Sequence, residues 1–362
     1  MYYKNAFLYF IKIFCAIVAF MVVMIYVSDP YMIFHKKLWN RNQVYGDFRV
    51  QNYGLIKFME FDNLIFGSSM MENTSAMDAN EKIGGKWLNL SFGAQRPFER
   101  LTTINWALKN HKIKNVITVI DDHWFELGRI EQNFNPNLYL DEFSAKWKTY
   151  FQTNALSCIF FGKHCHMLKT NVFDRPCAWI DKPYYSRRFG GFENWIAAES
   201  TDTQIQDAFR MLLENDTHCD INDEKYKLVI NQELVPLFQN QDTVFHLIIS
   251  PYSGLYWAYD FKNFDCRMRP YKYLIEQTRG YENVVVYWLY DEDYVFDITK
   301  YKDLTHHTDA MNSMELDAVK NRSHVINVQN YDAKIQKFKT RVSKINLDEY
   351  VCRIRDYYDA KK

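Results

Sequence analysis

The first residues whose types suggest chemistry are two serines that follow an apolar run. Residues 64–66 are Leu-Ile-Phe, and Gly67, Ser68 and Ser69 come directly after them. An apolar run stopped by small residues predicts a buried strand that ends in a tight turn. Turn formation alone accounts for Gly-Ser-Ser. Ser69 is a candidate nucleophile only if a base elsewhere in the chain takes its proton.

A candidate base and its carboxylate partner occur far downstream. The segment 301–312, YKDLTHHTDAMN, places Asp303 and His306 three residues apart. One turn of chain brings a carboxylate at that spacing to the imidazole Nδ1–H, which leaves Nε2 to face a serine. His307 is the nearest competitor but lacks this spacing. A metal site built from these residues and Asp309 is a weaker interpretation, because the offsets are irregular.

The segments around these residues predict an alternating α/β fold. Short apolar stretches predict five strands, and segments of helical periodicity separate several of them. The expected strands are residues 63–67, 86–93, 115–121, 243–251 and 283–290, and the expected helices are 97–111, 269–280 and 309–320. Continuously apolar strands of this kind are typical of a parallel sheet covered on both faces. We therefore expect an α/β fold with a mostly parallel five-stranded sheet.

This sheet would bring the candidate residues to one edge. Ligands of parallel sheets bind at the carboxyl ends of the strands. Ser69, Gly93 and Asp121 each lie at the end of a predicted strand. We expect these residues to lie on the same side of the fold.

Three segments resemble the sequence blocks of SGNH (GDSL-type) hydrolases. Residues 67–69 resemble the Gly-x-Ser block, LNLSFGAQ resembles the second block, and the Asp303 to His306 segment resembles the C-terminal Asp-x-x-His block. The resemblance covers residues 62–125 and 243–320 and implies an SGNH-like three-layer sandwich. It implies Ser69 as nucleophile, His306 as base, Asp303 as its partner, the Gly93 and Ser69 N–H groups as the oxyanion hole, and Asn89 as a candidate substrate contact.

One block departs from the pattern. The third block should supply an asparagine side chain to the oxyanion, but the third strand ends in Asp121, Asp122 and His123. One such donor contributes roughly 3–4 kcal/mol to transition-state stabilisation. Asp122 and His123 are candidate substrate contacts, although capping a helix is an equal alternative.

The N-terminal segment predicts a membrane anchor. Residues 7–27 are apolar apart from Lys12, and a helix of that length spans roughly 30 Å. A cleaved signal peptide is the alternative, but the run is long and no A-x-A-like cleavage site follows it. Basic residues flank both sides, so the positive-inside rule gives little direction. We expect the usual arrangement, a single-pass membrane protein with its domain on the extracytoplasmic (periplasmic) side.

These signals divide the chain into five regions. We expect a short cytoplasmic N-terminus (1–6), the anchor (7–27), an aromatic connector (28–61), the SGNH-like domain (62–329) and a C-terminal helical segment (330–362). An insertion at about 125–240 interrupts the alternation. It either carries specificity at the active-site end or is a solvated excursion with its own core. Arg187 and Arg188 within it could meet an anionic polymer, although a solvated pair of charges is the simpler account.

The composition limits the classes of ligand and partner that the sequence supports. The chain carries 44 basic and 44 acidic side chains, which gives no electrostatic basis for nucleic-acid binding. The sequence indicates no cofactor. The Cys and His residues of segment 158–177 match no trusted zinc spacing, so we expect no metal there. Six cysteines outside the anchor permit disulfides without specifying their pairing.

The resemblance also suggests a function. The branch that looks most similar comprises membrane-anchored envelope proteins, such as those of teichoic acid D-alanylation and alginate O-acetylation. It implies acyl transfer or ester hydrolysis on a cell-envelope glycan or polymer, beside a membrane-bound O-acyltransferase partner. The rival interpretation is a catalytically inactive SGNH-like scaffold that binds the polymer and the membrane acyltransferase. The departing third block favours the scaffold, and the intact Asp-x-x-His segment favours the enzyme.

Overall fold

The protein is described by a computed structural model that covers most of the chain. The structure describes residues 2–36, 43–45, 48–125, 134–152, 156, 159–160, 167–171, 183–214, 218–219 and 221–362. The chain forms two compact units. The N-terminal unit comprises Met1–Glu60, Thr102–Asn110 and Ile130–Val172, and the sheet unit comprises Phe61–Leu101, His111–Arg129 and Phe173–Lys362.

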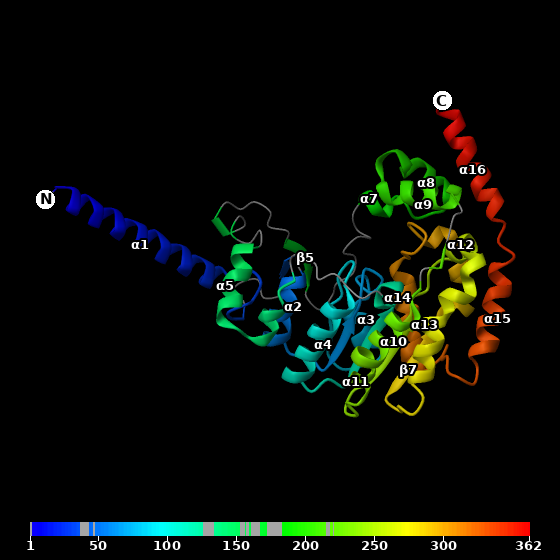
Figure 1. The fold of residues 1–362 in the computed structure, drawn as a ribbon, viewed down its shortest axis with the longest axis horizontal. Helices are drawn as coiled ribbons and strands as arrows, with labels where there is room; N and C mark the ends of the chain where they lie inside the picture. Colours follow the sequence, from blue (N-terminus) through cyan, green and yellow to red (C-terminus); the bar gives the residue numbers. More distant parts are fainter. Residues whose placement is uncertain are drawn as a thin grey trace. The chain divides into compact units, whose positions relative to one another are not determined.

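The sheet unit is built on five parallel strands (Figure 1). Its strands are β2 (Asn63–Phe66), β3 (Trp87–Asn89), β4 (Asn115–Ile120), β6 (Val244–Ile249) and β7 (Val284–Trp288). They lie in the order β3-β2-β4-β6-β7, and every neighbouring pair is parallel. The predicted α/β class and five-stranded sheet are confirmed. The strands are shorter than predicted. The one expected to end at Gly93 ends at Asn89, and the one expected to end at Tyr290 passes at Leu289 into η6 (Leu289–Asp291).

Helices lie on both faces of this sheet. The connection from β2 to β3 runs in one direction along the sheet, and the later connections to β4, β6 and β7 run in the other. The right-handed rule for parallel crossovers therefore places α3 on one face and the helices of the later connections on the opposite face. The helices are α3 (Ala76–Lys82), α7 (Pro183–Ser186), α8 (Phe192–Ala198), α9 (Thr203–Glu214), α10 (Asp223–Val229), α11 (Val235–Phe238), α12 (Gly254–Tyr259), α13 (Phe264–Gln277), α14 (Asp309–Asn321), α15 (Tyr331–Val342) and α16 (Leu347–Ala360). Lys82 of α3 reaches Ser313 and Asp317 of α14, which joins these two helices.

One predicted helix begins earlier than the sequence suggests. The segment 269–280 belongs to α13, which starts at Phe264 and contains Pro270 in its interior. Proline cannot donate to the carbonyl four residues before it, which here is that of Cys266. The Arg269 Nε donates to this carbonyl at 3.4 Å, so the helix tolerates the proline. Gly280 ends the segment with a φ of +97°, as its position predicted.

The N-terminal unit contains the apolar helix α1 (Tyr2–Ser28). Residues Asn5–Ser28 are long and apolar enough to cross a membrane. The unit also contains α2 (Phe48–Phe58), η2 (Pro136–Leu140), α5 (Phe143–Gln152) and an antiparallel pair, β1 (Gln43–Tyr45) with β5 (Met167–Asn171). Helix α4 (Pro97–Asn110) begins in the sheet unit and ends in this one.

The predicted connector and insertion are packed into the two units. Most residues of α2 are buried, so segment 28–61 includes a packed helix. The insertion 125–240 is divided, because its first part belongs to the N-terminal unit and its later part to the sheet unit. The C-terminal segment is helical, as its pattern predicted, and buries Phe338 and Ile354.

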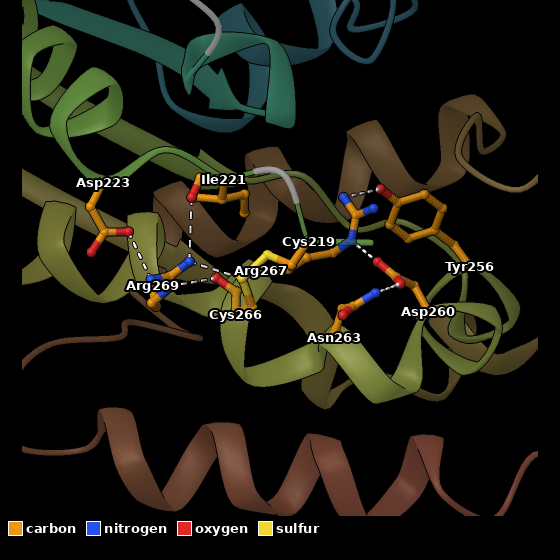
Figure 2. Close-up of a disulfide and its surroundings, with 9 residues drawn as sticks. All are labelled: Cys219, Ile221, Asp223, Tyr256, Asp260, Asn263, Cys266, Arg267 and Arg269. Atoms are coloured by element: carbon orange, nitrogen blue, oxygen red, sulfur yellow. Dashed lines mark hydrogen bonds and ion pairs between the residues drawn. A yellow bond between two sulfur atoms is a disulfide. The ribbon is translucent and has the colours of Figure 1, made fainter. Parts of the chain in front are cut away.

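A disulfide closes the end of the insertion onto the sheet unit. Cys219 and Cys266 are bonded across 47 residues of sequence (Figure 2). Arg269 lies beside this bond and joins the carbonyl of Ile221 to the carboxylate of Asp223 (Figure 2). The segment after Cys219 is therefore held against α13 by one covalent and two polar links.

Candidate active site

The structure brings the predicted serine, histidine and aspartate together. Ser69 Oγ lies 2.8 Å from His306 Nε2. His306 Nδ1 lies 2.9 Å from both carboxylate oxygens of Asp303. This is the hydrogen-bonded geometry of a Ser-His-Asp triad, in which the carboxylate orients the ring and the ring faces the hydroxyl. The side chain of His306 is 20% exposed, so the ring is accessible from one side.

The turn that carries Ser69 is fixed by tight packing. Gly67 leaves β2 next to Val119 and Met71, and an added Cβ would come within 2.8 and 2.9 Å of those side chains. Only a glycine fits this close approach without a shift of its neighbours. The buried Ser68 donates its hydroxyl to Asp121 at the end of β4. These contacts position the hydroxyl of Ser69 at the ends of β2 and β4.

This position coincides with the topological switch point of the sheet. β2 lies next to β4 in the sheet. The connection that leaves β2 runs to β3 on one side, whereas the connection that leaves β4 runs to β6 on the other side. Crevices at the carboxyl ends of strands that flank such a point are the usual ligand sites of open parallel sheets. The strand order thus predicts a ligand site where the serine and histidine meet.

The carboxylate of Asp303 is set in a dense hydrogen-bonded loop. It accepts hydrogen bonds from the backbone N–H groups of Thr305 and His306, at 3.0 and 2.8 Å. Lys302 Nζ lies 3.1 Å away. Burial by itself would raise the pKa of Asp303, but the charges of His306 and Lys302 and these hydrogen bonds hold that pKa well below its usual value. The carboxylate therefore stays ionised beside the imidazole.

The later part of the insertion covers this loop. Trp195 Nε1 donates to the carbonyl of Tyr301 at 3.2 Å. Arg188, which is fully buried, pairs with Asp202 at 2.8 Å. Buried side chains of α8, α9, α12, α16 and the 301–304 loop form one apolar group, the cover cluster: Phe192, Trp195, Ala198, Ile205, Ala208, Phe209, Leu212, Leu255, Tyr259, Tyr301, Leu304 and Ile354. Segment 183–214 is thus a structural support of the histidine loop.

Lys302 connects the insertion to the triad. It is 3% exposed, lies over the ring of Tyr185 at 4.9 Å and reaches Gln204 at 3.4 Å. Burial lowers the pKa of this ammonium, while the neighbouring Asp303 opposes that effect. Lys302 is not among the site residues that the sequence predicted. Its position next to Asp303 was a signal, but a charge pair one residue apart is more often solvated than buried.

The predicted oxyanion donor is engaged by a side chain. The Gly93 N–H donates to Glu72 Oε1 at 2.6 Å. A tetrahedral oxyanion would need the same donor, so in this arrangement a carboxylate oxygen occupies its place. Glu72 is not among the site residues that the sequence predicted, although it follows Ser69 by three residues in the same turn. The contact joins segments from two different strand ends, and spacing alone does not reveal it.

Asn89, the candidate substrate contact, is held by hydrogen bonds to the backbone. It is fully buried at the end of β3. Its amide donates to the carbonyls of Met71 and Thr74, both at 2.8 Å, and its oxygen accepts from the Ser91 N–H at 2.9 Å. This set of bonds holds the turn after Ser69 against the second strand end. The role of Asn89 as a substrate contact stays a prediction, and its hydrogen bonds show that it also braces this turn.

Asp121, at the end of β4, is held in a buried set of hydrogen bonds. It is 1% exposed and accepts from both Ser68 and Arg100, whose guanidinium lies within 3.1 Å of both carboxylate oxygens. Arg100 also stacks on Trp124, with 4.9 Å between guanidinium carbon and ring centre. An ionised carboxylate accepts hydrogen bonds and cannot donate one to an oxyanion. Asp121 therefore positions the serine turn.

Of the remaining candidates Asp122, His123 and His307, only His307 has a described side chain. The backbone of Asp122 and His123 forms part of η1 (Asp122–Phe125), but their side chains lie outside the described residues. His307 is buried, its Nδ1 bonds to the Thr308 carbonyl, and burial lowers its pKa to about 4. His307 is therefore a poorer candidate for the base than His306. The cysteine segment 158–177 lies largely outside the described residues, and within the described residues no three His, Cys, Asp or Glu side chains are grouped to hold a metal.

The chain was compared with known proteins in three ways. No known protein family, no curated protein and no solved structure matches it. The geometry of the site and the topology of the sheet therefore carry the functional argument.

Proposed function

We propose that this protein is a membrane-anchored serine O-acyltransferase or esterase of the SGNH type. The observation that carries the proposal is the continuous chain of hydrogen bonds from Ser69 through His306 to Asp303. The order of the three residues along the chain and the five parallel strands support the SGNH-like sandwich. Ser69 and His306 are 237 positions apart in the sequence and lie at hydrogen-bonding distance. Neither the turn that carries Ser69 nor the loop that carries His306 requires this contact for its own conformation.

The proposed reaction has two balanced steps. Ser69 Oγ attacks the carbonyl carbon of an acyl ester as His306 Nε2 takes its proton, so a C–O bond forms and the carbonyl becomes an oxyanion. The oxyanion collapses, the leaving alcohol takes the proton from His306, and an acyl-serine remains. A sugar hydroxyl or water then attacks the acyl-serine with His306 again as base, which releases the new ester or the acid. Asp303 holds the imidazole and stabilises its protonated form.

The proposed acceptor is a glycan or polymer of the cell envelope, and the proposed location is outside the cytoplasm. Helix α1 supplies the anchor. The Cys219–Cys266 disulfide supports an oxidising compartment, because such bonds are rare in the cytosol. The acyl donor would be handed over by a membrane-bound O-acyltransferase partner.

A catalytically inactive scaffold is the second candidate. It is favoured by Glu72, which occupies the Gly93 N–H, and by Asp121, which replaces an amide donor with a carboxylate. Under this proposal the same fold binds polymer and a membrane acyltransferase without forming an acyl-serine.

Fluorophosphonate labelling of the full-length protein separates the two candidates. We expect wild type to form a covalent adduct at Ser69, located by mass spectrometry, and Ser69→Ala to form none. Replacement of His306 by Gln should lower the labelling or turnover rate on the order of 10⁶-fold if the residues act as a unit.

Ser68→Ala is the matched control. It removes the neighbouring hydroxyl, which points to Asp121 and away from the imidazole, and should still be labelled. Absence of an adduct in wild-type protein that carries its disulfide would support the scaffold.

A further inference from the structure

Helix α5 of the N-terminal unit carries an exposed apolar stripe. Phe143 and Phe151 are 73% and 60% exposed, and Trp147 is partly exposed between them. The spacing of four residues places all three on one side of the helix. Leu140, which is 69% exposed, precedes them at the end of η2. Large apolar side chains gathered in this way on a surface mark a site of interaction.

The stripe continues from the end of the apolar helix α1. Tyr26, near the last turn of α1, contacts Phe34, with 5.5 Å between ring centres. Phe34 packs against Trp147 at 4.8 Å, and Trp147 contacts Phe143 at 6.4 Å. A row of aromatic rings therefore runs from the point where a membrane span would end to the exposed side of α5.

The connection between α1 and α5 is held by a buried carboxylate. Asp29 is fully buried and accepts from the N–H groups of Ile33, Phe34 and His35, at 2.8 to 2.9 Å. The hydroxyl of Tyr150, on the buried side of α5, also donates to Asp29. Because the backbone after α1 is tied to α5 in this way, the exposed stripe keeps a constant place beside the end of the span.

We propose that the α5 stripe is a second membrane contact, which lies in the headgroup region at the end of α1. Aromatic side chains prefer the membrane–water interface, and a helix with one apolar side lies flat in it. The occupant is a lipid surface, because the stripe is continuous with the end of a helix that crosses one. This inference rests on the anchor of the proposed function.

Photo-crosslinking of the full-length protein tests the contact. A benzophenone amino acid is placed at Phe143 or Phe151, and the protein is reconstituted in vesicles of phosphatidylethanolamine and phosphatidylglycerol that contain a traceable lipid. Gln152, which is exposed on the opposite side of α5, is the matched control. We expect lipid adducts at Phe143 and Phe151 that exceed those at Gln152 by about tenfold.

A fourth position separates the failure of this inference from the failure of the anchor. Phe14 lies in the middle of α1 and is exposed, so a benzophenone there reports insertion of the span. Lipid adducts at Phe14 together with background labelling on α5 would overturn the second contact alone. Background labelling at all positions would overturn the anchor and the contact with it. Adducts between two protein chains at Phe143 would replace the lipid surface by a protein interface.

Discussion

At the scale of single residues, Glu72 decides whether the Gly93 N–H is available to a reacting substrate. The carboxylate and an oxyanion carry the same charge and seek the same donor, so they cannot occupy it together. Under the proposed function, turnover requires the Glu72 side chain to move. The triad is in a hydrogen-bonded arrangement while this donor is taken, which makes Glu72 the residue that separates the resting geometry from the reactive one.

Removal of Glu72 should accelerate acylation. In Glu72→Ala the Gly93 N–H is released and a nearby negative charge is lost, so the second-order rate of fluorophosphonate labelling should rise at least about tenfold. Glu72→Gln keeps an acceptor but removes the charge and should fall between wild type and the alanine variant. A slower rate in both variants would show instead that the carboxylate supports the Gly93 loop.

At the scale of elements, α14 carries a buried acid directly behind the serine turn. Glu315 is fully buried and accepts a hydrogen bond from Asn312, whose amide also donates to the Met70 carbonyl. Burial raises the pKa of Glu315 to about 8. The helix therefore contributes a neutral carboxylic acid to the packing at neutral pH, and this protonation is coupled to the stability of the fold.

The stability of wild type relative to Glu315→Gln should fall as the pH rises. The folded pKa lies above the unfolded value near 4.5, so the folded protein holds a proton that the unfolded chain releases. The contribution is fully present below about pH 4.5 and is lost as the pH rises through about 8, at up to about 1.4 kcal/mol per pH unit. Denaturant unfolding at a series of pH values measures the difference. Parallel pH profiles for the two proteins would contradict the buried acid.

The elements also show which features the sequence could predict. Strands such as β4 were predictable because their apolar and β-branched residues are buried on both faces. The contact of Asp303 with His306 followed from local spacing. Helix α2 was missed because buried polar residues, including Gln51 and Asn52, conceal its packing.

The parts of the site that were missed depend on tertiary contacts. Glu72 meets Gly93 across two strand ends, and Lys302 is buried only because the insertion covers it. Asn89 and Asp121 were identified, but their buried hydrogen bonds make them supports of the serine turn. Residue types and spacing predicted the candidate catalytic side chains. The side chains that position them come together only through the tertiary fold.

At the scale of the whole molecule, the disulfide fastens the insertion to the sheet unit. Cys219 and Cys266 close a loop across 47 residues that includes α10, α11, β6 and α12. Closing a loop of this length lowers the entropy of the unfolded chain by an amount worth about 4 kcal/mol. The bond therefore stabilises the part of the sheet unit between Cys219 and Cys266, which includes β6.

Replacement of both cysteines by serine should lower the free energy of unfolding by about 4 kcal/mol. Denaturant unfolding of the oxidised proteins measures the loss, and peptide mapping confirms the pairing in wild type. Cys352→Ser is the control, because that cysteine is exposed and not in a disulfide. Equal stability of wild type and the double variant would show that the bond carries no such constraint.

The cover cluster has a consequence for the order of events in a newly made chain. Its members come from the insertion, from α12, from the loop that carries Asp303 and His306, and from Ile354 in α16. Ser69 leaves the ribosome early, whereas Ile354, a member of the cover cluster, is made only with α16. We therefore expect a chain truncated before α16 to lack part of the packing behind the His306 loop, so that, under the proposed function, Ser69 reacts with esters only after α16 has been made.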